Sequence, residues 1–197
     1  MNKNIVCKLR KVMAAALIMS ACISLSGCRG GDDTIPTLPP KEVPKQIAGA
    51  VLPSGGKWLF ADGEIVEDET MVHIKDGQSY TTKPTSFYVT EHSNWESTCA
   101  NTYYQVIIDR KDEYDKDFFE KKILVCAVDT AYAGQKYQFE GVMYAPENGS
   151  MVLTVYMSYD DSNAKRTLAN YYNFLEVEAD GIGQIDKIKV ETFIRAK

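Results

Sequence analysis

The sequence predicts a mainly β protein with antiparallel, sandwich-like sheets and one short helix around residues 110–121. Apolar and polar residues alternate through most of the chain beyond residue 57, which is the period of half-buried strands. Asn-Gly and Asp-Gly pairs separate these runs, as hairpin turns do. The helix is predicted for "DRKDEYDKDFFEKK", where Asp109 can cap the first turn, acidic residues come early and lysines come late.

The first strands are predicted between residues 58 and 100. "KWLFADGEIV", "TMVHIK" and "SFYVTEH" have strand-like patterns, with turns expected at Asp62-Gly63 and Asp76-Gly77. His73 belongs to the second run and is interpreted as a strand residue. Residues 58–100 could form a separate N-terminal β segment or the first half of one sandwich, and we favour the single sandwich.

A hairpin is predicted where "KYQFEGVMY" and "SMVLTVYMSY" are joined by "APENGS". A two-residue Asn148-Gly149 turn would set the apolar face of one strand against the polar face of the other. A three-residue loop that includes the preceding glutamate places Met143 opposite Leu153 and Phe139 opposite Met157. We therefore expect the three-residue loop.

Two further predictions concern the C-terminal half. "NFLEVEA" and "QIDKIKVETFI" flank "DGIG" and suggest a hairpin in which Glu176 pairs with Lys187 and Leu175 pairs with Ile188. "ILVCAV" is apolar on both faces, which is typical of a central, buried strand.

The first 27 residues have the order of an export signal. Four positive charges and no negative ones precede the apolar run "VMAAALIMSACISL", and Ser26 and Gly27 are small. The alternative is a retained membrane anchor, but the run falls short of the ~20 residues that a span requires. We expect residues 1–27 to be a signal peptide that is removed.

Leu25-Ser26-Gly27-Cys28 resembles the lipobox of bacterial lipoproteins. The resemblance implies cleavage before Cys28 and acyl chains, such as palmitate, on that residue. Two or three chains hold a protein stably at a membrane. Residues 28–57 carry several prolines and glycines and are interpreted as a tether. Residues 58–197 would then be a β domain outside the cytoplasm, lipid-anchored at the cell membrane or the outer membrane.

The charge of the mature chain excludes some partners. The whole sequence has 22 Lys and Arg against 27 Asp and Glu, and the signal carries four of the positive charges. The mature chain therefore has 18 against 27, a net charge of −9. Nucleic acid requires a basic face, and an acidic domain is repelled by anionic lipids. We expect no nucleic-acid partner and contact with the membrane only through the lipid.

Two cysteines remain after processing. Cys7 and Cys22 leave with the signal and Cys28 is acylated, which leaves Cys99 and Cys126. They could form one disulfide in an oxidising compartment. They could also remain thiols, with Cys126 as a small apolar residue of the "ILVCAV" strand.

The sequence contains no recognisable catalytic, cofactor-binding or metal-binding motif. It has two histidines without zinc-ligand spacing, no Gly-x-Ser-x-Gly and no phosphate-binding loop. A Cys99–His92 nucleophile pair is conceivable but has no identifiable orienting residue. We expect no catalytic residue, no cofactor and no metal.

Tyrosine pairs offer a candidate binding surface. Tyr103-Tyr104 and Tyr171-Tyr172 lie near expected strand ends, where exposed rings could contact a protein or a glycan. Packing within the core is the favoured interpretation, because aromatic residues are common in strands.

The stretch "YYQVIIDRKDEYDKDFFEKKILVCAV", followed by Gly134 and a strand with Tyr137, resembles the PrcB-like protease-complex lipoproteins. The similarity covers residues 103–194, within a PrcB-like part at 101–197. The paired glycines of that family are replaced here after Gly134 by Gln135 and Lys136. The resemblance implies a β domain that assists or holds another protein, and it implies no catalytic residues.

The sequence therefore favours a non-enzymatic, lipid-anchored protein that binds or scaffolds another envelope protein, such as a protease complex. A glycan- or peptide-binding surface module is the second hypothesis. A hydrolase that uses Cys99 or an acidic pair is the third.

Overall fold

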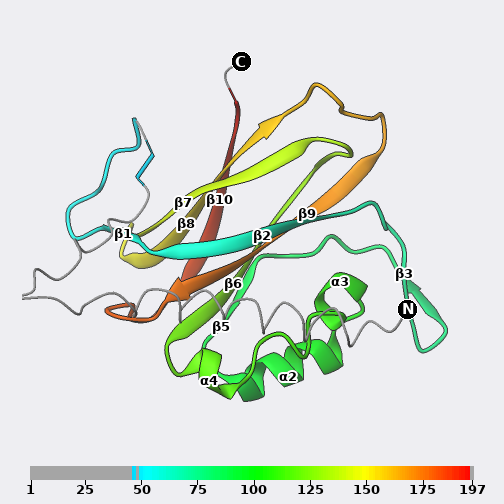
Figure 1. The fold of residues 1–197 in the computed structure, drawn as a ribbon, viewed down its shortest axis with the longest axis horizontal. Helices are drawn as coiled ribbons and strands as arrows, with labels where there is room; N and C mark the ends of the chain where they lie inside the picture. Colours follow the sequence, from blue (N-terminus) through cyan, green and yellow to red (C-terminus); the bar gives the residue numbers. More distant parts are fainter. Residues whose placement is uncertain (1–45, 48, 196–197) are drawn as a thin grey trace, which may run out of the picture. The chain divides into compact units, whose positions relative to one another are not determined.

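The computed structural model describes residues 46–47 and 49–195. The predicted signal peptide, the lipid site at Cys28 and the tether up to residue 45 lie outside the described residues. Within them the chain is mainly β, with antiparallel sheets, as the sequence predicts (Figure 1). None of the described helices is both long and apolar enough to cross a membrane.

The first sheet has four strands in the order β1-β7-β8-β10. The β1–β7 and β7–β8 pairs are antiparallel, whereas β10 runs parallel to β8. The strands are β1 (Lys57–Leu59), β7 (Lys136–Glu147), β8 (Ser150–Asp160) and β10 (Lys187–Ile194).

The second sheet has four antiparallel strands in the order β2-β9-β6-β5. The strand predicted to be central is β6, and its residues from Leu124 to Ala127 are fully buried. Both of its faces are covered, which explains why this segment is apolar throughout. The strands are β2 (Ala61–Asp68), β9 (Leu168–Glu178), β6 (Lys122–Tyr132) and β5 (Phe87–Val89).

Three helices cover the face of the second sheet that points away from the first sheet (Figure 1). They are α2 (His92–Asn101), α3 (Gln105–Ile108) and α4 (Lys116–Phe119). The single helix expected around residues 110–121 is reduced to α4, after a stretch of turns. Its cap is Asp115, whose carboxylate accepts a hydrogen bond from the backbone N–H of Phe118 at 3.0 Å. Asp109 instead ends α3.

Two buried clusters hold the layers together. The cluster between the sheets contains side chains from seven strands and the loop after β9, with Leu153, Val155 and Leu175 fully buried. The second lies between the second sheet and the helices, around Trp95 and Phe174. Burial of each large apolar side chain contributes roughly 1.5–3 kcal/mol. These two cores fix the positions of the surface loops between them.

The β7–β8 turn corrects the predicted loop. Glu147 pairs with Ser150, so Asn148 and Gly149 form a two-residue turn, and both have positive φ. A register shift between Phe139 and Gly141 then restores the predicted pairing of Phe139 with Met157. The shift turns Met143 to the outer face, where it packs near Ile47 and Trp58. The objection to the short turn fails because the shift puts Val142 and Tyr144 on the inner face, opposite Val155 and Leu153.

The predicted C-terminal hairpin is wrong. Glu176 lies opposite Leu124 of β6 and Asp62 of β2, while Lys187 begins β10 in the other sheet. Residues 179–186 cross from one sheet to the other, and Ile185 is 4% exposed within the inter-sheet cluster. The segment closes the end of the core instead of forming a tight turn.

The N-terminal segment contributes strands to both sheets. β1 pairs with β7, β2 with β9 and β5 with β6, so each joins a strand from residues 101–197. The expected Asp62-Gly63 turn is wrong, because both residues lie inside β2. The Asp76-Gly77 turn is confirmed between β3 (His73–Lys75) and β4 (Gln78–Tyr80).

Candidate functional site

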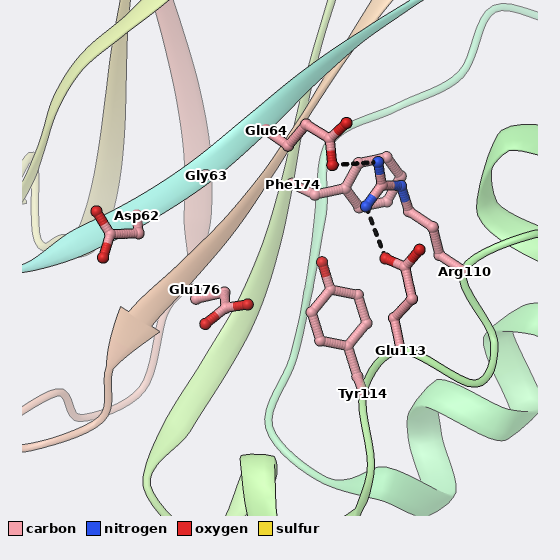
Figure 2. Close-up of a pocket in the computed structure, with 8 residues that line it drawn as sticks. All are labelled: Asp62, Gly63, Glu64, Arg110, Glu113, Tyr114, Phe174 and Glu176. Carbon is pink, nitrogen blue, oxygen red and sulfur yellow. Dashed lines mark hydrogen bonds and ion pairs between the residues drawn. The ribbon is translucent and has the colours of Figure 1, made fainter. Parts of the chain in front are cut away.

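A pocket with acidic walls lies on the helix-covered side of the second sheet (Figure 2). Its volume is about 340 Å³. β2 and β9 supply one wall, and the turns between α3 and α4 supply the other. The lining residues are Asp62, Gly63, Glu64, Arg110, Glu113, Tyr114, Phe174 and Glu176.

Strand register places two carboxylates directly opposite each other. Asp62 of β2 pairs with Glu176 of β9, and alternation puts Glu64 and Phe174 on the same face. Like charges at directly opposed positions destabilise a sheet. The Lys122 Nζ offsets part of this repulsion through an ion pair with Glu176 at 2.8 Å. The fold thus tolerates an unfavourable charge arrangement at this pocket.

Gly63 brings these two strands close together. A Cβ at this position would lie 2.5 Å from Leu175 Cδ2 and 2.7 Å from the Phe174 carbonyl oxygen. Real side-chain carbons do not approach a backbone oxygen so closely, so glycine is required.

Arg110 is the internal counter-charge of the pocket. Its guanidinium lies 2.9 Å from a Glu64 oxygen and 2.7 Å from a Glu113 oxygen, and 4.4 Å from the centre of the Phe174 ring (Figure 2). Burial alone would lower the pKa of Arg110, but the hydrogen bond that it donates to Glu64 and the charge of Glu113 raise this pKa overall. Arg110 therefore remains cationic.

The pocket retains a negative balance. Four lining carboxylates face two cations, Arg110 and Lys122, so negative charges exceed positive ones by two. Burial raises the pKa of Tyr114 to about 12, so this phenol stays neutral and can donate a hydrogen bond. The pocket can accept a cationic group beside aromatic rings.

The pocket lies against an open sheet edge. β2 is an outer strand, and no described strand pairs with it on the side away from β9. An unpaired strand edge presents N–H and C=O groups to a further strand. Several acidic side chains along β2 discourage pairing with chains that lack positive charge. Neither this edge nor the pocket was anticipated from the sequence, where Asp62-Gly63 resembled a turn.

The predicted tyrosine surface is only partly present. Tyr171 is 1% exposed and Tyr172 is fully buried, so they form no surface. The hydroxyl of Tyr171 donates to the Tyr132 carbonyl at 2.8 Å and accepts from the Gln135 N–H at 3.0 Å. The expected strand end is wrong here, because β9 already begins at Leu168, which puts both tyrosines inside the strand and their rings in the cores.

Tyr103 and Tyr104 line a second cleft of about 300 Å³. The Tyr103 ring stacks on Tyr80 with centroids 4.4 Å apart, and His73 meets the Tyr104 ring edge-on at 4.7 Å. The Tyr104 hydroxyl donates to the Thr82 carbonyl at 3.0 Å. The β3–β4 hairpin is thus packed against the segment between α2 and α3.

The two cysteines are both free thiols in the structure, buried in the same cluster. Burial raises the pKa of Cys99 to about 11 and that of Cys126 still further. His92 and Cys99 are seven residues apart on α2, about 10 Å along the helix axis. The Cys99–His92 pair considered from the sequence is therefore out of hydrogen-bond reach.

Among residues 46–47 and 49–195, no group of three or more His, Cys, Asp or Glu side chains is arranged to hold a metal ion. No family model, no curated protein and no solved structure matches the chain.

Proposed function

We propose that this chain is a non-enzymatic, lipid-anchored extracytoplasmic protein that binds or scaffolds another envelope protein. The lipobox resemblance at Cys28 supports the anchor. The acidic pocket beside the open edge of β2 supports the binding role. The PrcB-like resemblance of residues 103–194 suggests a protease complex as the partner.

A single observation carries the binding role. Asp62 and Glu176 lie directly opposite each other at an open strand edge. Self-repulsion between these carboxylates costs stability in the free protein. A basic partner segment would relieve that repulsion and could also add its backbone to β2. Strand addition of this kind gives affinity through main-chain hydrogen bonds and specificity through side-chain pockets.

The partner segment is expected to be extended and to contain lysine or arginine. One of its cations would lie between Asp62 and Glu176 (Figure 2). Because the charges are partly exposed, binding should weaken as salt concentration rises.

The test is amine-reactive cross-linking in intact cells, followed by mapping of the cross-linked peptides. We expect the parent protein to cross-link through Lys121 or Lys122, next to the pocket, to one basic segment of one envelope protein. Asp62→Asn with Glu176→Gln should lower the cross-linking yield about tenfold. This is the loss of affinity expected when two exposed charge contacts with the partner are removed. The unfolding free energy should stay within about 0.5 kcal/mol of the parent value.

Two further strains complete this experiment. Glu147→Gln with Asp161→Asn removes the same charge from exposed sites elsewhere and should leave the cross-link unchanged. Cys28→Ala should abolish metabolic labelling with a fatty acid and release the protein from membranes. Equal cross-linking by the two charge-neutralised variants would refute the pocket as the binding site, and continued labelling of Cys28→Ala would refute the anchor.

A further inference from the structure

The second cleft, lined by Tyr103 and Tyr104, differs from the acidic pocket in its chemistry. Its lining contains one cation, Lys83, and no carboxylate, although the chain as a whole is acidic. Three apolar side chains, Pro84, Phe87 and Ile107, line the cleft together with several hydroxyl groups. The loop from β4 to β5 forms one wall and α2 with α3 forms the other. A ligand here would be neutral or anionic, with an apolar part.

Lys83 is the side chain that distinguishes an anionic ligand from a neutral one. It is exposed, and no described carboxylate lies within ion-pair distance of it. Lys122, Lys165 and Lys189 each pair with a glutamate. The charge at the cleft is therefore available to a partner.

The cleft is held in shape by the hairpin next to it. The Nζ of Lys75 donates to the Ala100 carbonyl at 2.8 Å and to the Thr102 carbonyl at 3.0 Å. The Tyr104 hydroxyl is fixed to the backbone of Thr82. The Lys75 bonds hold the hairpin against α2, and the Tyr104–Thr82 bond joins the two walls, so little ordering is needed when a ligand binds.

The aromatic geometry favours a peptide over a sugar. Sugar rings stack on exposed aromatic faces, but Tyr103 stacks against Tyr80 at an interplanar angle of 8° and contacts Tyr104 at 4.6 Å between centroids. Its faces are already engaged within the protein. The apolar side chains Phe87 and Ile107 can instead receive an aliphatic or aromatic side chain, and the threonine hydroxyls can bond to a peptide backbone.

We propose that this cleft binds the carboxyl-terminal residues of a protein partner whose last residue is apolar. The terminal carboxylate pairs with Lys83, and the last side chain lies against Phe87 and Ile107. Capture of a chain terminus is an established mode of peptide recognition. This site is separate from the acidic pocket, so each proposal can fail without the other.

The test is fluorescence anisotropy with the folded protein and a panel of labelled hexapeptides. The panel varies the last residue over all amino acids, with each peptide made as the free carboxylate and as the carboxamide. We expect peptides ending in Leu, Ile, Val, Phe or Met to bind as carboxylates and to lose about three- to tenfold in affinity as amides. Lys83→Gln should lower the affinity of the carboxylates to that of the amides.

Lys136→Gln is the matched control, because it removes an exposed lysine from a different sheet and should change nothing. Asp62→Asn with Glu176→Gln should also leave the cleft unaffected, which separates this site from the acidic pocket. Absence of binding by every carboxylate peptide, or equal affinity for acids and amides, overturns the proposal. Binding of N-acetylglucosamine oligomers that is lost on Thr85→Trp would assign the cleft to glycans and would overturn it as well.

Discussion

At the scale of single residues, Gly63 shows how one small residue shapes the candidate site. Its missing side chain lets β2 lie close to β9 and sets Asp62 against Glu176. The sequence could not reveal this, because an Asp-Gly pair is among the strongest turn signals. Glycine in a strand can equally mark a close backbone approach, and only the pairing partner distinguishes the two.

Gly63→Ala should therefore lower stability by about 1–3 kcal/mol, the cost of forcing extra volume into a close contact. The new Cβ would meet a backbone oxygen at 2.7 Å, which cannot be relieved by a rotamer change. Gly183→Ala is the control, because its Cβ would meet only the Tyr144 hydroxyl at 3.4 Å. Urea denaturation measures both. Equal midpoints for the two variants would contradict the close approach.

At the scale of elements, alternation predicted most strands and the pairing of β7 with β8, but not the partners of β9 and β10. The β6 strand is identified by its apolar run, and the face of β8 formed by Leu153, Val155 and Met157 packs into the inter-sheet core. The partner of β10 was missed because Glu176 and Glu178 match Lys187 and Lys189 in a hairpin register. The signal against the hairpin was Ile182 and Ile185, two apolar residues in a segment that would otherwise be a polar turn.

The crossover of residues 179–186 from one sheet to the other can be tested by Ile185→Ala. In a hairpin loop this change would cost less than about 0.5 kcal/mol. In the structure the side chain is 4% exposed within the inter-sheet core, so the expected cost is about 2–5 kcal/mol. Ile74→Ala, at a 73% exposed position of β3, should have almost no effect. Thermal denaturation of both variants would decide, and a neutral Ile185→Ala would argue against the crossover.

At the scale of the whole molecule, the sequence predicted the mainly β class, while the candidate sites depend on contacts between distant segments. Residues near 62, 110 and 175 meet only after β2 pairs with β9 and the turns after α3 fold over them. No local sequence pattern predicts that these segments come into contact. The same folding buries ionisable phenols and thiols, including Tyr172, whose hydroxyl has no hydrogen-bond partner among the described atoms.

These buried groups make alkaline stability the last prediction. Burial raises the pKa of Cys99 to about 11 and those of Tyr114 and Tyr171 to about 12, and it also raises the pKa of Tyr172. The unfolded chain ionises near pH 9 for cysteine and pH 10 for tyrosine. Above pH 9 the folded state therefore binds more protons than the unfolded state, so the unfolding free energy falls as pH rises. The stabilising contribution is complete below pH 9 and is lost progressively as pH rises toward 12.

Urea denaturation between pH 7.5 and about 10.5 measures this slope. Tyr172→Phe should make the fall shallower above pH 10 and should cost little at neutral pH, because it removes a buried hydroxyl that makes no hydrogen bond. Tyr132→Phe is the control, because it removes a tyrosine hydroxyl from a ring that is 56% exposed and should leave the slope unchanged. Two results would show that burial of the phenols does not cause the loss of stability at alkaline pH. One is an unfolding free energy that does not change with pH across this range, and the other is an equal reduction of the slope by both variants.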